Sequence, residues 1–205
     1  MVRYRSLCAI LLMAFCAACG MAERDDSDSK SYDYLTLQDQ AFKSYCLEAF
    51  DTNRDGKLSR YEAESVRCID CSARGIASLS SIEAFSQLEE LNCANNEIEH
   101  LDLGNNHELQ RVNCAGNGLK SLEIGSLRRL TKVDCSDNKL TELALNQTAS
   151  LHSLDCRQNR FTILDLAPCN AQLKADARQN PQLEIIYYRA GQQVNYGAPA
   201  VLVER

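Results

Sequence analysis

The sequence predicts an α/β solenoid, in which short strands of successive repeats form a parallel sheet on the concave side and the convex side is mostly non-helical. Three observations support this fold class. A period of 21 residues runs through the middle of the chain, an acidic loop between two helical patterns precedes it, and a segment rich in β-forming residues follows it. The expected boundaries are a signal peptide at 1–18, a flexible acidic tether at 19–34, a helix-loop-helix cap at 35–66, repeats at 67–182 and capping strands at 183–205.

The first residues have the pattern of an exported protein. Arg3 and Arg5 precede the apolar run SLCAILLMAF, which is too short to span a bilayer as a folded helix, and the small residues AAC follow. This order resembles a bacterial lipoprotein signal in which Cys19 is lipidated, with an ordinary cleaved secretory signal as the alternative. The stretch GMAERDDSDSKSYDY resembles acidic tethers of surface lipoproteins in Gram-negative bacteria. The resemblance implies a lipid-anchored protein of the outer membrane or cell surface.

The charge balance argues against nucleic acid as a partner. The chain carries 22 basic and 28 acidic residues, and loss of the signal would also remove Arg3 and Arg5. Nucleic-acid binders need clustered Lys and Arg to neutralise phosphates, and this composition does not supply them.

The segment DTNRDGKLSRYE, from Asp51 to Glu62, matches the spacing of an EF-hand calcium loop. Gly56 stands where such a loop turns sharply. The resemblance implies Ca²⁺ ligands at Asp51, Asn53, Asp55, the carbonyl of Lys57, Ser59 through a water, and Glu62 with both carboxylate oxygens. A solvated turn without a metal is the alternative. Before the loop, Phe42, Cys46 and Phe50 share one helical face, and a short helix is expected from Ser59 to about Ser65.

Four units of 21 residues follow from Leu88, each with a cysteine and, three places later, an asparagine. The cysteines are Cys93, Cys114, Cys135 and Cys156, and the asparagines are Asn96, Asn117, Asn138 and Asn159. The pattern resembles the leucine-rich repeat, LxxLxLxxNxL, with cysteine in the third leucine place. A looser first unit has Arg74 in the asparagine place, and a decayed last unit keeps Ala175, Ala177 and Asn180 in phase.

The spacing of the repeat has a physical reason. Residues two apart in a strand point the same way, so Leu91 and Cys93 are expected to face the interior. An asparagine at the turn can donate to and accept from backbone groups of neighbouring turns, which leucine cannot do. No unit can bury its own apolar face, so we expect stability to be collective.

The helix-loop-helix segment stands where a solenoid needs a cover for its open apolar end. It resembles the N-terminal cap of internalin-like proteins. No second loop follows, which argues against a paired-hand switch. The resemblance implies a structural calcium ion that fixes the cap to the repeats.

Eight of the 11 cysteines lie after Cys19. Equivalent residues on adjacent parallel strands are about 4.7–4.9 Å apart, whereas a disulfide needs β-carbons about 3.5–4.5 Å apart, so we predict buried thiols in the repeat column. A bridge between Cys46 and Cys68 is left open. The motif CIDC at 68–71 has no second pair with ligand spacing, so it does not predict a zinc site.

The last segment, LEIIYYRAGQQVNYGAPAVLVER, predicts a terminal strand pair, because two runs of β-forming residues are separated by Gly and Pro. A ligand platform formed by Tyr187, Tyr188 and Tyr196 is the alternative.

The concave face is the candidate partner site. The outward columns beside the buried strand residues are polar, mixed in charge and without aromatic side chains, with Arg67 expected to begin one column and Asp70 the other. The candidate residues are Glu90, Asn92, Arg111, Asn113, Lys132, Asp134, Ser153 and Asp155. We expect a protein-recognition surface on a monomer, with a solvated ladder or a glycan-capturing face as alternatives.

Catalysis is the competing class of function. His152 stands beside Ser153 and near Asp155, but alternation along a strand predicts opposite directions for neighbours. No glycine-rich phosphate loop accompanies them. The sequence therefore predicts a non-enzymatic, calcium-stabilised and lipid-anchored module for protein–protein interaction or adhesion, with a hydrolase using His152 as an alternative.

Overall fold

The computed structural model describes residues 33–205. They form one compact unit, Asp33–Arg205. The predicted signal, Cys19 and nearly all of the tether lie outside the described residues. Between residues 33 and 205, no helix has the length and apolar character needed to cross a membrane.

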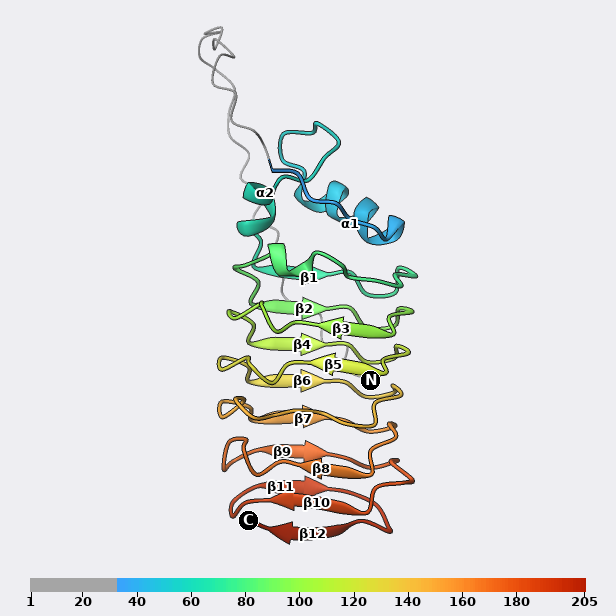
Figure 1. The fold of residues 1–205 in the computed structure, drawn as a ribbon, viewed down its shortest axis with the longest axis vertical. Coiled ribbons are helices and arrows are strands. Elements are labelled where there is room, and N and C mark those ends of the chain that lie inside the picture. Colours follow the sequence, from blue (N-terminus) through green and yellow to red (C-terminus); the bar gives the residue numbers. More distant parts are fainter. Residues whose placement is uncertain (1–32) are drawn as a thin grey trace, which may run out of the picture. The chain divides into compact units, whose positions relative to one another are not determined.

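A parallel sheet runs the length of the unit, with its strands stacked one above another (Figure 1). Its seven strands, in spatial order, are β1 (Cys68–Asp70), β2 (Glu90–Asn92), β4 (Arg111–Asn113), β6 (Lys132–Asp134), β7 (Ser153–Asp155), β9 (Lys174–Asp176) and β11 (Gln193–Asn195). The pairing is in register, so that Leu91 lies beside Val112, and Val112 beside Val133. These middle residues are buried, which confirms the predicted alternation.

The opposite side of the solenoid has short strands and little helix. Here β3 (His100–Asp102) pairs with β5 (Ser121–Glu123), and β10 (Ile185–Tyr188) lies between β8 (Ile163–Asp165) and β12 (Val201–Glu204). A 3₁₀ helix, Ile82–Ala84, precedes them. The α/β solenoid with a mostly non-helical convex side is therefore confirmed.

Asparagines join consecutive turns, as the spacing predicted. The side-chain amide of Asn138 donates to the carbonyls of Cys114 (3.0 Å) and Cys135 (3.1 Å), and its oxygen accepts from the Leu119 N–H (3.0 Å). In the first turn, Arg74 has no such side chain, and its N–H instead donates to Asn96 of the next turn (3.0 Å). Each asparagine thereby satisfies backbone groups that the tight turns would otherwise leave unpaired.

The register corrects one predicted column. Cys68, not Arg67, pairs with Glu90 and begins the first outward column. Arg67 precedes the strand and ion-pairs with Glu89. The first repeat follows the repeat pattern least closely. Because it has no asparagine in the usual place, the sequence did not fix the predicted register of its strand.

The C-terminal segment forms three strands where two were expected. The extra strand, β11, extends the seven-stranded sheet, while β10 and β12 join β8, all in parallel. The segment therefore continues the solenoid by further half-turns. The three tyrosines do not form one platform, because Tyr187 and Tyr188 are neighbours in one strand and Arg205 stacks on the Tyr187 ring at 3.4 Å.

Helices α1 (Gln40–Phe50) and α2 (Arg60–Glu64) precede the first strand and are joined by the acidic loop. The ring of Phe42 lies 6.3 Å from that of Phe85 in the first turn. The hydroxyl oxygen of Tyr45 accepts the N–H of Asp70 on the edge strand β1 (3.1 Å). The cap therefore covers both the apolar end and the exposed sheet edge.

Asp39 fastens this cap to the solenoid. One carboxylate oxygen accepts the Phe42 N–H at the start of α1 (2.9 Å), and the other accepts the N–H groups of Ala77 (2.9 Å) and Ser78 (3.1 Å) in the first turn. Burial would raise the pKa of Asp39, but these hydrogen bonds outweigh it and lower the pKa below its usual range.

Candidate functional site

The acidic loop between α1 and α2 is held by its own side chains. Asp51 accepts the Gly56 N–H (2.9 Å), Asn53 accepts the Asp55 N–H (3.0 Å), and Asp55 accepts the Lys57 N–H (2.8 Å). Gly56 has a φ of 78°, in the left-handed region that a side chain disfavours. The predicted turn is therefore present, and its short polar side chains point back toward the loop backbone.

Glu62 is the most constrained of the predicted calcium ligands. It is 6% exposed, and one oxygen accepts the N–H and hydroxyl of Thr52 (2.9 and 2.8 Å). The other oxygen accepts the N–H and hydroxyl of Ser59 (3.0 and 2.8 Å), which forms a capping box for α2. Burial alone would raise the pKa of Glu62, but the hydrogen bonds from Ser59 and Thr52 lower it to about 2.

The loop fits a calcium ion by the type of its donors, since carboxylate, amide and carbonyl oxygens are what Ca²⁺ prefers. The carboxylate groups of the loop do not converge on a single point. Among residues 33–205, no three His, Cys, Asp or Glu side chains gather closely enough to hold a metal. To serve as a ligand, Glu62 would have to exchange its bonds with Thr52 for the ion.

The outward residues of the seven-stranded sheet form two columns, which we call the sheet face. The first column consists of Cys68, Glu90, Arg111, Lys132, Ser153, Lys174 and Gln193. The second consists of Asp70, Asn92, Asn113, Asp134, Asp155, Asp176 and Asn195. The structure therefore brings together all eight residues that the sequence nominated for this face.

The side chains of the second column have a structural role in forming turns. Each of its first six side chains accepts the N–H two residues later, as Asn92 does from Ala94 (3.3 Å) and Asp134 does from Ser136 (3.1 Å). This bond turns the chain at the end of each strand, which is what Asn and Asp side chains commonly do. Half of the nominated residues are thus explained by the fold itself.

The first column is freer to meet a partner. Arg111 and Lys132 are exposed, and Arg111 ion-pairs with Glu90 on the neighbouring strand. Ser153 is half-buried between Lys132 and Lys174. The side chains of the first column project from strands that are paired in register, so the sheet fixes their spacing.

His152 does not behave as strand alternation predicted. The strand begins only at Ser153, so His152 lies before it and is exposed together with the outward residues. Its Nδ1 hydrogen-bonds with the carbonyl of Ser150. The argument from alternation does not apply to His152, because this residue lies outside the strand. Its ring is hydrogen-bonded to the backbone, and among residues 33–205 no hydrogen bond joins it to Ser153 or Asp155.

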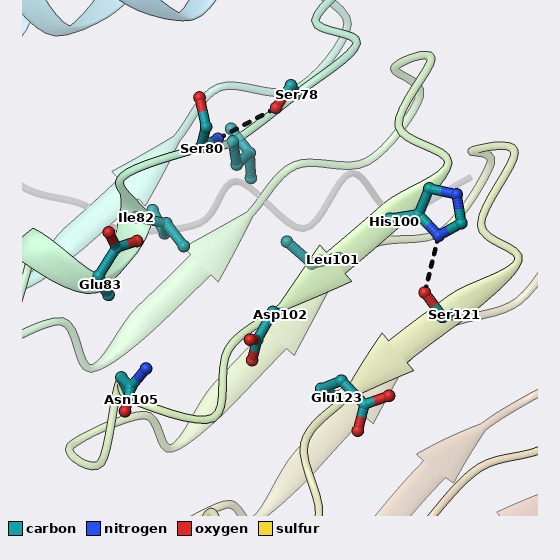
Figure 2. A pocket seen from close by; sticks show the side chains of 11 residues that line it. Ser78, Ser80, Ile82, Glu83, His100, Leu101, Asp102, Asn105, Ser121 and Glu123 are labelled. Atoms are coloured by element: carbon teal, nitrogen blue, oxygen red, sulfur yellow. Dashed lines mark hydrogen bonds between the residues drawn. The ribbon is translucent and has the colours of Figure 1, made fainter. Parts of the chain in front are cut away.

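A recess on the opposite side of the solenoid was missed by the sequence reasoning (Figure 2). It has a volume of about 470 Å³ and an apolar floor that includes Ile82 and Leu101, and Glu83, Asp102 and Glu123 surround it. In it, His100 Nδ1 lies 2.9 Å from the Ser121 hydroxyl. The pair comes from adjacent strands 21 residues apart, so only the repeat register could have revealed it.

Among residues 33–205, no hydrogen bond from a third side chain orients His100 as the base of a nucleophilic site. The Oδ1 atom of the neighbouring Asp102 accepts the N–H of Gly104 (2.8 Å). The recess is therefore lined by three carboxylates and a hydrogen-bonded Ser–His pair.

The repeat cysteines lie in the core, as predicted. Cys93, Cys114, Cys135 and Cys156 are fully buried, and none is in a disulfide. Burial raises the pKa of each thiol above its usual range. Cys46 is also an unbridged, buried thiol, so the bridge to Cys68 that the sequence left open is not formed.

Comparison with solved structures gives Listeria monocytogenes internalins as neighbours. The functional domain of InlJ, which includes a cysteine ladder, has a TM-score of 0.66 and 28% identity, over 76% of this chain and 37% of that one. An internalin, inlF, has a TM-score of 0.58 and 17% identity, over 76% and 51%. Internalin C2 has a TM-score of 0.51 and 17% identity, over 82% and 93%. This chain thus spans well under two thirds of the length of the first two.

Comparisons with models of protein families and with curated proteins gave no match. The InlJ domain includes a cysteine ladder, and this chain likewise stacks buried cysteines in successive turns. The residues that the structure describes therefore form a leucine-rich-repeat solenoid, similar in fold to the internalins.

Proposed function

We propose that this chain is a non-enzymatic binding module whose sheet face recognises a protein partner, in protein–protein interaction or adhesion. The observation that carries the proposal is the first column of the sheet face. Its polar and charged side chains stand in strict register on a rigid sheet and, unlike those of the second column, are not needed to turn the chain. Matched charges on such a surface give specificity and speed of association.

A protein fits this face better than a glycan does. Sugar recognition commonly uses aromatic side chains as stacking surfaces. Neither column of the sheet face contains one. The solved neighbours are internalins, which share the repeat architecture on which the proposed surface is built.

Charge reversal tests the proposal. Arg111→Glu with Lys132→Glu should weaken capture of the partner, which is first identified by affinity purification with the chain lacking residues 1–19. Both positions are exposed, so the melting temperature should stay unchanged, because such substitutions usually alter stability by about 0.5 kcal/mol or less. The matched control is Lys139→Glu with Arg160→Glu, which changes the same charge away from the sheet face. Equal capture of the partner by both double variants would exclude the sheet face as the partner-binding site.

Calcium is proposed as a structural ion in the cap. The oxygen donors of Asp51, Asn53 and Asp55, the turn at Gly56 and the position of Glu62 support it. Because an ion that binds only the folded chain stabilises it by mass action, millimolar calcium should raise the melting temperature above that in chelator. Asp51→Ala should abolish the gain. Identical melting curves with calcium and with chelator would remove the ion from the proposal.

A lipid anchor at Cys19 is proposed from the sequence pattern alone. Such an anchor would display the solenoid at the outer membrane or cell surface. Cys19→Ser should move the protein from the membrane fraction to the soluble fraction, with Cys16→Ser as the matched control. Retention of the Cys19 variant in membranes would contradict it, and protease added to intact cells would report whether the solenoid faces outward.

A further inference from the structure

Two lysines of the sheet face are left without a counterion. Lys132 on β6 and Lys174 on β9 are both exposed, and neither forms an ion pair with any residue between 33 and 205. The third cation of the first column is compensated. Arg111 pairs with Glu90, as already described. The two lysines are therefore the free cations of the first column.

Two of the three neighbouring carboxylates are paired with arginines. Asp155 is bonded by Arg157 (2.7 Å) and Asp176 by Arg178 (2.7 Å), each through two guanidinium nitrogens. The hydrogen bond and charge of Arg178 lower the pKa of Asp176, so this carboxylate stays ionised and paired. Within the described part of the chain, Asp134 has only the neutral donors of Ser136. From β6 to β9 the sheet face and its two arginines therefore carry four cations (Lys132, Lys174, Arg157 and Arg178) and three carboxylates (Asp134, Asp155 and Asp176), an excess of one positive charge on an otherwise acidic chain.

The distance between the lysines is set by the sheet. β7 lies between β6 and β9, so the two backbones are two strand spacings apart, about 9.6 Å. The residue between them is Ser153, which is small and half-buried. A partner can therefore lie across the gap and reach both ammonium groups.

This spacing discriminates between partner conformations. In a strand that runs along the stack, residues on one face are two or four apart, about 6.7 or 13 Å. In an α-helix, residues seven apart lie on nearly the same face, about 10.5 Å apart. Measured between backbones, a helix with carboxylates at positions i and i+7 differs from the lysine spacing by about 1 Å, whereas an extended peptide differs from it by about 3 Å, so the spacing favours the helix.

We propose that Lys132 and Lys174 dock an acidic helix of the partner, aligned along the stack of strands, with two carboxylates seven residues apart. This inference rests on the proposed function and adds the chemistry and conformation of the ligand. Exposed ion pairs are individually weak, so recognition comes from meeting both lysines at once.

The test uses the full chain in mild detergent and two fluorescent helical peptides of identical composition. One peptide carries glutamates seven residues apart, and the other carries them five apart, which places them on different faces. The seven-spaced peptide should bind about tenfold more tightly at low salt, and Lys132→Glu with Lys174→Glu should remove that difference. The matched control, Lys43→Glu with Lys139→Glu, should keep it. A peptide with lysines seven apart should bind the Lys132→Glu, Lys174→Glu variant in preference to the wild type.

Equal binding of the two peptides to the wild type would overturn the inference. The inference would also be overturned if a linear acidic polysaccharide displaced both peptides equally, whatever the spacing of their glutamates. That result would make the two lysines a site for polyanions in general. If Arg111→Glu with Lys132→Glu abolishes capture of the natural partner while the spacing of the glutamates in the peptides has no effect, the proposal of an acidic helix is wrong and the proposal that the sheet face binds the partner is retained.

Discussion

Replacing Asp39 should separate the cap from the repeats without touching the apolar core. Asp39→Ala removes the N-cap bond of α1, worth about 1 kcal/mol, and two bonds to the first turn, worth about 0.5–1.5 kcal/mol each. The expected loss in the free energy of unfolding is therefore about 2–4 kcal/mol. For a chain of this length it corresponds to a fall in melting temperature of roughly 10 °C.

Two further variants make this prediction specific. Asp39→Asn keeps a good N-cap but has only one acceptor oxygen, so about half of the loss is expected. Asp33→Ala removes an exposed carboxylate that only pairs with exposed Arg60, and it should cost less than about 1 kcal/mol.

Urea unfolding followed by circular dichroism gives the free energies, and hydrogen exchange reports the bonds directly. The amides of Ala77 and Ser78 should lose protection in Asp39→Ala but keep it in Asp33→Ala. If Asp39→Ala unfolds like the wild type and those two amides remain protected, then the clamp contributes nothing and the account of the cap is wrong.

Three more predictions follow from the hydrogen bonds and burial. The folded-state pKa of Glu62 is depressed from 4.5 to about 2, so its contribution to stability is complete above pH 4.5 and is lost as the pH falls toward 2. Glu62→Gln should flatten this part of the stability curve, and an unchanged slope would contradict the capping box. Asn138→Ala should lower the free energy of unfolding by about 3 kcal/mol or more, because four backbone groups lose their buried partner; a loss below about 1 kcal/mol would argue against the asparagine ladder. The thiol of Cys135 should react with a thiol reagent only after unfolding, since it is fully buried, and rapid labelling of the native chain would refute its place in the core.

The repeats were predictable from sequence because their constraint is local and recurs. Leu91 and Cys93 face inward for the same reason as Val112 and Cys114, so one correct turn fixes the next. The prediction was weakest at the ends of the array. There Arg74 replaces an asparagine, and the strand Gln193–Asn195 keeps the polar–apolar–polar pattern but is followed by Tyr196 and Pro199 in the places of the cysteine and the asparagine.

The contacts that were missed join residues far apart in the sequence. Asp39 was not nominated, since its partners Ala77 and Ser78 lie 38 and 39 residues away and contribute only backbone N–H groups. His100 and Ser121 meet only because the repeat places them on adjacent strands. The eight nominated residues lie on one face of the sheet, as expected, but the turn-forming role of its second column depends on backbone geometry that the residue types alone do not specify.

Site-specific photo-crosslinking tests the central claim, that the sheet face is the partner surface, most directly. A photoreactive residue at position 153 stands in the middle of the first column, and one at position 123 stands on the opposite side, beside the recess. The account predicts that the partner crosslinks from position 153 and not from position 123. Crosslinking from position 123 with none from position 153 would contradict it and would place the partner on the acidic side of the solenoid.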